Sequence, residues 1–201
     1  MPNSIKSKVC ENKEDKEKKI LEASYSLLTE KGFKDTTIQE IVDRAKVAKG
    51  TFYLYFKDKY DVENKLIINI SKNLFENAIK EVNEKKLNDF SDKIIAIIDY
   101  VIDYLKDNKD VLNIISKSLS LGVFGDNISN LIDDKPIGIL DIFLKSAKDN
   151  NIKLKNPEIT LFMIIELTSS VVFSSIMLNI PLPIDKVKPY LYESIRKIIK
   201  E

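Results

Sequence analysis

Apolar residues recur every three or four positions along most of this 201-residue chain, and this spacing predicts helices. The first helix is expected from about Glu14 to Lys31, and Gly32 follows where a left-handed residue commonly ends a helix. Asp58 can cap a long helix that continues to about Lys85, roughly 40 Å at 1.5 Å per residue. The inward stripe predicted for the first helix comprises Ile20, Ala23, Ser24, Leu27 and Leu28.

The rest of the chain keeps this periodicity. Ser91 is expected to open a helix that is apolar nearly all round and therefore central. Asn156-Pro157-Glu158 offers an N-cap, a proline where no N–H is needed and an acid at the positive helix end. Other helices are expected over about 111–119, from near Pro136 to 150, from 157 to about 179, and from between Asp185 and Pro189 onward. With only 5 glycines and 6 prolines, the pattern predicts an all-α fold of about nine helices.

Two short helices and a tight turn are predicted between Thr36 and Lys59. Thr37 and Glu40 have the spacing of a capping box, in which each side chain satisfies a backbone N–H of the first turn. The segment 46–48 then interrupts the apolar pattern, and Phe52 and Phe56 resume it. This arrangement is typical of a helix-turn-helix. The residues expected to face inward from its first helix are Ile38, Ile41, Val42 and Ala45.

The residues left pointing away from this core suit a polyanion. They are Lys49, Gly50, Thr51, Tyr53 and Tyr55. A cation and hydroxyl groups can bind phosphates and base edges, and a glycine allows the backbone to approach DNA closely. From Arg44 to Lys59 the local balance is +4, five basic residues less one acid, in a chain of overall charge +1. Such a basic face indicates nucleic-acid binding. The alternative for the same segment is a plain helical hairpin with half-buried tyrosines and solvated lysines.

The segment resembles the TetR family of bacterial transcriptional regulators, through KKILEASYSLLTEKGF, KGTFYLYF and KDKYDVENKL within residues 18–66. The resemblance implies DNA contacts at Thr37, Lys46, Lys49, Gly50, Thr51, Tyr53, Tyr55 and Lys59. Two positions depart from the family pattern. Lys46 stands where the turn usually has Gly, which adds a phosphate contact or strains the turn, and Ala48 replaces the usual Ser cap, worth about 1 kcal/mol.

The resemblance also implies the organisation of the whole chain. Residues 1–57 would form the helix-turn-helix domain, and residues 58–201 a helical domain that binds a ligand and dimerises through its last two helices. The expected function is a repressor that binds a palindromic, double-stranded DNA operator as a homodimer and is released by a small-molecule effector. The alternative is a helical dimer that binds a ligand or partner and has lost DNA recognition, since Lys46 and Ala48 are unusual.

Aromatic residues of the second domain are the candidates for lining the effector pocket. Together with one acid, the candidate pocket residues are Phe90, Tyr100, Tyr104, Phe124, Phe143, Phe162 and Glu166. An acid inside an otherwise apolar helix is costly unless it is paired or functional. Glu166 is therefore expected either to anchor a cationic ligand or to meet a cation across the dimer seam, and the small serines beside it favour the seam.

Composition argues against catalysis, a cofactor or a metal. The chain has no histidine, so it lacks the usual general base and the commonest metal ligand. It has one cysteine, Cys10, and no glycine-rich phosphate loop. Asp99 and Asp103 are the only acid pair that suggests a carboxylate enzyme, and a solvated helix edge is the commoner arrangement. The N-terminus lacks the apolar core of a signal peptide, so a cytoplasmic location is expected, and the hydroxyls and glutamate in 157–179 argue against a membrane span.

Overall fold

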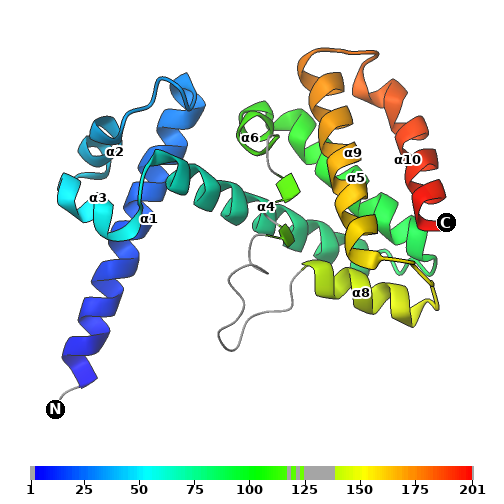
Figure 1. Ribbon diagram of the computed structural model, residues 1–201, viewed down its shortest axis with the longest axis horizontal. Coiled ribbons are helices and arrows are strands. Elements are labelled where there is room, and N and C mark those ends of the chain that lie inside the picture. The colour runs from blue at the N-terminus through cyan, green and yellow to red at the C-terminus, as the bar shows by residue number, and fades with distance from the viewer. Residues whose placement is uncertain (1–2, 117–118, 121–122, 125–138, 201) are drawn as a thin grey trace. The chain divides into compact units, whose positions relative to one another are not determined.

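A computed structural model describes residues 3–116, 119–120, 123–124 and 139–200, and every regular element in these ranges is a helix (Figure 1). The all-α prediction is confirmed. The helices are α1 (Asn3–Lys31), α2 (Ile38–Ala45), α3 (Lys49–Tyr55), α4 (Lys59–Glu84), α5 (Phe90–Asp107), α6 (Lys109–Ile115), α8 (Ile139–Asp149), α9 (Pro157–Met177) and α10 (Ile184–Lys200).

The helix boundaries follow their caps. Asp58 Oδ1 accepts from the N–H of Asp61 at 2.9 Å, and Asn156 Oδ1 accepts from that of Ile159 at 3.1 Å, as expected for N-caps. Two boundaries differ from prediction. The first helix begins at Asn3 rather than near Glu14, and α5 begins at Phe90 because the cap is Asp89 rather than Ser91. The helix expected from near Pro136 is described only from Ile139, and Pro136 lies outside the described residues.

The chain divides into two compact units, Met1–Leu66 and Ile67–Glu201, so the division falls within α4. The predicted domain boundary between residues 57 and 58 would instead assign the whole of α4 to the second domain, and it stays a prediction. In the first unit the predicted stripe of α1 is buried, with Ile20 and Ser24 wholly inaccessible to solvent. Ile41 and Phe52, each at most 1% exposed, bring α2 and α3 onto the same core.

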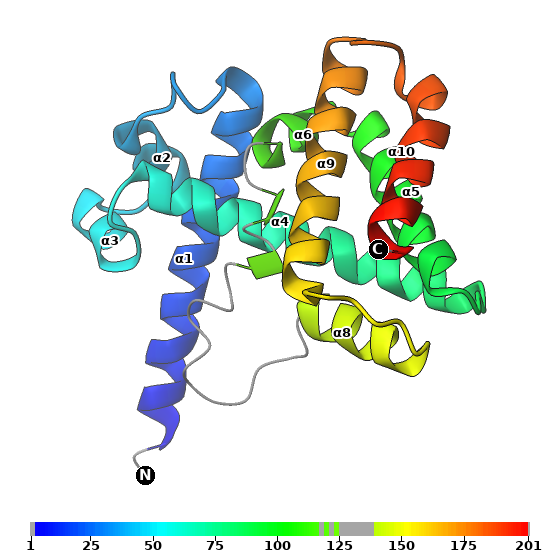
Figure 2. The same ribbon diagram turned by 45° about the vertical axis from the view of Figure 1, so that its right-hand side comes forward.

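In the second unit α10 packs on α9 and α5 (Figure 2). The buried residues at their centre include Ile102, Val172 and Ile195. Ion pairs link the sides of α5 and α10 that face each other. Residues later in α5 pair with residues earlier in α10, as expected for two antiparallel helices. The charged atoms lie 2.7 Å apart for Asp92 and Arg196, 2.6 Å for Asp99 and Lys188, 2.5 Å for Asp103 and Lys188, and 2.8 Å for Lys106 and Asp185.

These pairs show that Asp99 and Asp103 have a structural role, since both bind Lys188 of α10. Tyr192 also donates a hydrogen bond to Asp99. Burial alone would raise the pKa of Asp99, but the hydrogen bonds from Lys188 and Tyr192 outweigh it and hold that pKa below its usual range. Burial would lower the pKa of Lys188, and the two carboxylates raise it instead. The pair predicted as a solvated helix edge therefore holds α10 against α5.

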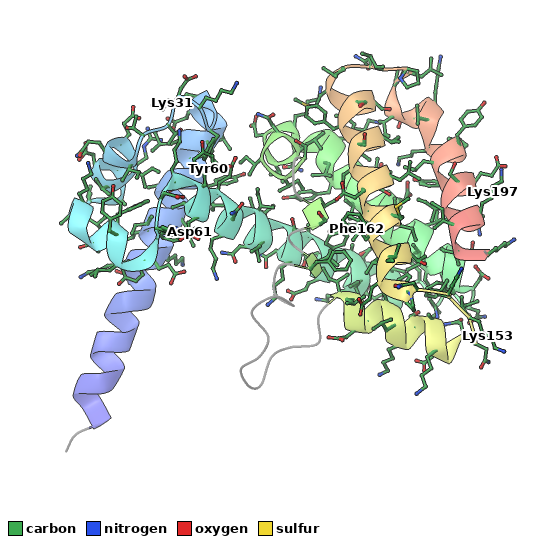
Figure 3. All side chains as sticks on the ribbon, in the orientation of Figure 1. Lys31, Tyr60, Asp61, Lys153, Phe162 and Lys197 are labelled. Atoms are coloured by element: carbon green, nitrogen blue, oxygen red, sulfur yellow. The ribbon has the colours of Figure 1, made fainter. Side chains whose placement is uncertain are left out.

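Among the residues that the structure describes, one helix, α9, is long and apolar enough to cross a membrane by length and composition alone. Core helices of soluble proteins pass the same test. Its exposed side carries Ile159, Phe162 and Met163, which are 43–58% exposed; Phe162 is labelled in Figure 3. An apolar face of this extent on a helix end is a candidate contact surface.

Candidate DNA interface and ligand cavity

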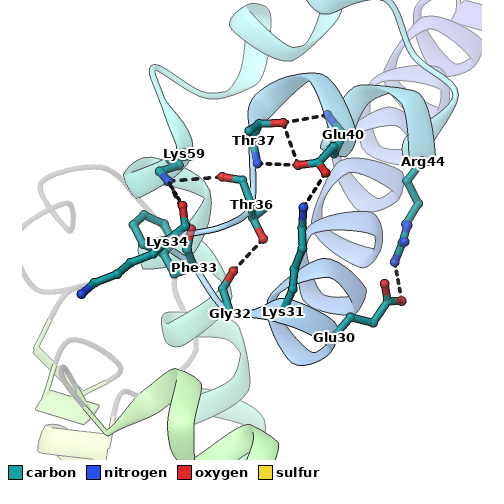
Figure 4. A network of polar contacts seen from close by, with 10 residues as sticks. All are labelled: Glu30, Lys31, Gly32, Phe33, Lys34, Thr36, Thr37, Glu40, Arg44 and Lys59. Carbon is teal, nitrogen blue, oxygen red and sulfur yellow. Dashed lines mark hydrogen bonds and ion pairs between the residues drawn. The ribbon is translucent and has the colours of Figure 1, made fainter.

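The start of α2 is held by the capping box that the sequence predicts (Figure 4). Thr37 Oγ1 accepts from the N–H of Glu40 at 3.3 Å, and the N–H of Thr37 donates to Glu40 Oε2 at 2.9 Å. Lys31, at the end of α1, pairs with the same carboxylate. The hydrogen bond from Lys31 and those from Thr37 lower the pKa of Glu40 to about 2. Thr37 is therefore fixed in position with its side chain at the surface.

The turn between α2 and α3 depends on Lys46. This residue has φ 55° and ψ 44°, the left-handed conformation. Its N–H donates to the carbonyl of Asp43 at 3.3 Å, and the N–H of Val47 donates to that of Val42 at 3.0 Å, which together form a Schellman motif. The position that usually holds Gly therefore needs a positive φ, and Lys46 adopts it at a conformational cost. Lys46 itself is exposed.

Helix α3 is held by its aromatic side. Ala48 is its N-cap and makes no side-chain hydrogen bond, as the sequence predicts. Phe52 and Phe56 are buried, and their ring centroids lie 5.7 Å apart. The ring of Tyr53 meets that of Phe52 edge-on at 5.4 Å. Apolar packing thus compensates for the missing cap and sets which side of α3 faces solvent.

The solvent side of α3 carries most of the predicted DNA-contacting residues. Lys49, Gly50 and Tyr53 are exposed, and Thr51 and Tyr55 are half-buried. A Cβ built on Gly50 would meet nothing within 4 Å, so the fold itself does not require glycine there. Leu54, which is not among the predicted contacts, is 81% exposed. An exposed apolar side chain on such a face can contact a thymine methyl group.

Lys59 differs from the other predicted contacts. Its ammonium donates to the backbone carbonyls of Phe33, Lys34 and Thr36 at 3.1, 3.3 and 3.2 Å. It also lies 4.5 Å from the ring centroid of Phe33. All three N–H donors are therefore engaged with the segment between α1 and α2 (Figure 4). The predicted phosphate contact of Lys59 stays a prediction, and the structure shows this lysine anchoring that segment.

The basic face is also smaller than the count of residues suggested. Arg44 pairs with Glu30 of α1 at 2.5 Å, and the hydrogen bond from Arg44 holds the pKa of Glu30 below its usual range. Arg44 thus contributes no free cation. Lys46, Lys49 and Lys57 are exposed, and none of their ammonium groups forms an ion pair within the described ranges. These three lysines lie in or beside α3 and supply its positive potential.

The second unit contains an apolar cavity of about 100 Å³ between α4, α5, α8 and α9. Phe143 is the one predicted pocket residue among those that line it, and Phe90 packs behind, with ring centroids 5.3 Å apart. Most of the lining is aliphatic, with Ile94, Ile97 and Ile98 supplied by α5. Sequence reasoning missed these residues because it searched for aromatic side chains.

The other predicted pocket residues lie elsewhere. Phe124 and Phe162 contact each other, with ring centroids 6.0 Å apart, and Tyr100 and Tyr104 do not line the cavity. Glu166 is exposed on α9, in a shallow depression of about 280 Å³ that it shares with residues of α6. The acid therefore lies apart from the apolar cavity. No cluster of three potential metal-ligating side chains occurs in the part of the chain that the structure describes.

Comparisons with known proteins find similar sequences and folds among transcriptional regulators. Residues 20–62 match the family described as bacterial regulatory proteins, tetR family. The uncharacterized HTH-type transcriptional regulator YhgD of Bacillus subtilis is 26% identical over 164 residues, 79% of this chain and 83% of that protein. The fold is similar to that of the fatty acid degradation regulator FadR from Bacillus halodurans, with TM-score 0.60, 18% identity, and coverage of 89% of this chain and 96% of the other. FadR from Bacillus subtilis, in complex with stearoyl-CoA, gives TM-score 0.60 and 18% identity over 88% of this chain and 96% of that one.

Proposed function

We propose that this chain, which belongs to the TetR family of bacterial transcriptional regulators, is a repressor that binds a palindromic operator as a homodimer and releases it when a small molecule binds the second unit. Members of this family act by binding DNA rather than by catalysis. A cytoplasmic location accompanies the proposal, because the operator lies there.

The observation that carries DNA binding is the solvent side of α3. Lys49, Gly50 and Tyr53 are exposed together on a helix whose opposite side is fixed by buried Phe52 and Phe56. An exposed cation, a position without Cβ and a phenol offer a phosphate contact, close backbone approach and base-edge contacts. The lysines that border α3 add the electrostatic attraction that dominates affinity for DNA.

The exposed face of α9 supports the homodimer. The exposed apolar side chains on this face are Ile159, Phe162 and Met163, and they can be shielded from water only by contact with another surface. A second copy of the chain offers the same apolar patch across a two-fold axis. Glu166 lies on this exposed side too, which favours the seam over the pocket for that residue. A Met163→Glu variant should be monomeric by light scattering at micromolar concentration, with unchanged circular dichroism. A dimeric Met163→Glu protein would oppose the role of this face.

The choice of residue matters in that experiment. From the sequence alone, a charge in the final helix, as in Ile195→Glu, is expected to dissociate or unfold the dimer. Ile195 is wholly buried inside the protomer, however, so its charged variant should unfold the second unit rather than separate two subunits.

The cavity between α4, α5, α8 and α9 is the proposed effector site. It is apolar and lies wholly in the second unit. The similarity in fold to a FadR that binds stearoyl-CoA supports an effector with an aliphatic part. Binding there would alter the packing of α4, which continues into the first unit. Because a dimer fills two half-sites only when its two reading helices are one DNA turn apart, such a change would release the operator.

The second candidate function is a helical dimer that no longer recognises DNA. Its support was the unusual pair Lys46 and Ala48, but the turn keeps its Schellman motif and α3 forms without a side-chain cap. A mobility-shift titration with the DNA upstream of the protein's own gene distinguishes the two. A specific complex that competitor DNA does not remove supports the repressor, and no shift at micromolar protein supports the alternative.

A further inference from the structure

The polar groups of the apolar cavity gather at one end. Its lining includes Asn83, Lys93 and Ser146 beside twelve other residues that are all apolar. Asn83 lies in the last turn of α4 and Lys93 in the first turn of α5, so both adjoin the segment 85–89 that connects these helices. Ser146 follows Phe143 by one turn, and the ring of Phe143 contacts that of Phe90 at the start of α5.

This polar end is open to solvent. Asn83 is exposed and Lys93 half-buried, whereas Phe75 and Ile98, which line the cavity away from that segment, are at most 7% exposed. The ammonium of Lys93 forms no ion pair with any residue in the described ranges. A half-buried cation without an anionic partner, at the mouth of an aliphatic cavity, is suited to an anion whose tail lies inside.

The cavity volume limits the length of that tail. An engineered apolar cavity of roughly 150 Å³ binds benzene, with its six carbon atoms, so about 100 Å³ holds about four. The lining is dominated by isoleucine rather than by aromatic rings, which suits a flexible saturated chain better than a planar ring.

We propose that the cavity binds a short saturated acyl chain whose anionic head pairs with Lys93. This inference rests on the proposed effector site and specifies its ligand chemistry. Two sources offer that chemistry, a free carboxylate or an acyl thioester whose carrier has phosphates. In both, the chain fills the space between Ile97 and Ile164. The carboxylate of the free acid would pair with Lys93 at the solvent end, whereas a thioester would place its neutral carbonyl there, within reach of the ammonium of Lys93, and its carrier's phosphates farther out in solvent.

The test measures binding to the purified protein without DNA, by calorimetry and ligand-observed NMR. From propanoate to pentanoate the affinity should rise about fourfold per added methylene, the equivalent of about 0.8 kcal/mol each, and should level off beyond pentanoate. Pentanoyl-coenzyme A distinguishes the two sources: tighter binding than pentanoate identifies the thioester, and weaker binding identifies the free acid. No binding of either compound overturns the proposal, as does an affinity that keeps rising through octanoate.

Two ligands of equal chain length that differ in charge test Lys93 itself. Lys93→Gln should weaken pentanoate binding about tenfold and leave 1-pentanol binding unchanged, whereas Lys145→Gln, at an exposed position of α8, should change neither. Equal loss of both ligands would assign Lys93 a packing role and refute the anion pairing. Because these measurements need no DNA, pentanoate that binds at Lys93 without releasing the operator would refute the effector mechanism and leave the ligand assignment standing.

Discussion

Replacing Lys46 with glycine should stabilise the protein and weaken its binding to DNA at the same time. Lys46 has φ 55°, and a left-handed L-residue costs roughly 1–2 kcal/mol. Glycine removes that cost but loses roughly 0.5–1 kcal/mol more chain entropy on folding. The difference predicts a gain of about 0.5–1 kcal/mol, or about 1–4 °C in the midpoint of thermal unfolding.

Lys86 provides a matched control for this prediction. It has φ 50°, is exposed, and follows the end of α4 in the second unit, outside the helix-turn-helix segment. Lys86→Gly should therefore give a similar gain in stability and leave operator binding unchanged. If the two units unfold separately, calorimetry should show each variant moving the transition of its own unit.

Mobility-shift titrations at several salt concentrations separate the charge of Lys46 from its conformation. If Lys46 contacts a phosphate, Lys46→Gly should bind the operator more weakly at low salt, and the slope of log affinity against log salt should flatten by about one unit. Lys46→Asn, which tolerates the left-handed region and lacks the charge, should reproduce that loss. The prediction of backbone strain at Lys46 is wrong if Lys86→Gly stabilises the protein and Lys46→Gly does not. An unchanged salt slope for Lys46→Gly would show that Lys46 makes no phosphate contact.

Other variants test the remaining parts of the interface. Gly50→Ala should raise helix stability by about 0.5–1 kcal/mol, since a Cβ there meets nothing within 4 Å, and should weaken operator binding; unchanged affinity would mean that no DNA group approaches Gly50. Tyr53→Ala and Lys49→Ala should each cost about 1–3 kcal/mol of operator affinity with unchanged circular dichroism, and full affinity in both variants would show that α3 is not the reader. Because the folded-state pKa of Glu40 is about 2 against 4.5 for the free group, its stabilisation should be complete above pH 4.5 and disappear as the pH falls towards 2; Glu40→Gln should abolish this dependence in acid unfolding, and an unaltered curve would contradict it.

The elements that the sequence predicts well are those whose cause is local. Thr37 and Glu40 are three residues apart, and Asn156 caps an N–H three residues on, so neighbouring residues alone decide these helix starts. Gly32 has φ +82° as its place after α1 predicts, and Lys46 takes a left-handed conformation at the position where the resemblance implies glycine. The burial of Phe52 and Phe56 follows from their spacing of four residues.

Helical periodicity predicts which side of a helix is apolar, but it does not predict which other helix packs against that side. Lys59 was expected on a phosphate, yet its ammonium reaches carbonyls 23 to 26 residues back along the chain. Arg44 of α2 was counted as a free cation, but it forms an ion pair with Glu30 of α1, which neutralises its charge. Lys188 joins Asp99 and Asp103 across 85 to 89 residues, which turned a suspected solvated edge into a contact between helices.

The sequence by itself determined the helical class, the helix-turn-helix and the exposure of Lys49, Gly50 and Tyr53 on α3, because each depends on backbone hydrogen bonds and spacing within a turn or two. Only the tertiary structure decided which of the lysines remain free, where Glu166 lies and which isoleucines enclose the cavity. Those features depend on how apolar faces from distant segments pack together. Many arrangements of the same helices would bury similar apolar area, and the contacts that distinguish them come from residues far apart in the chain.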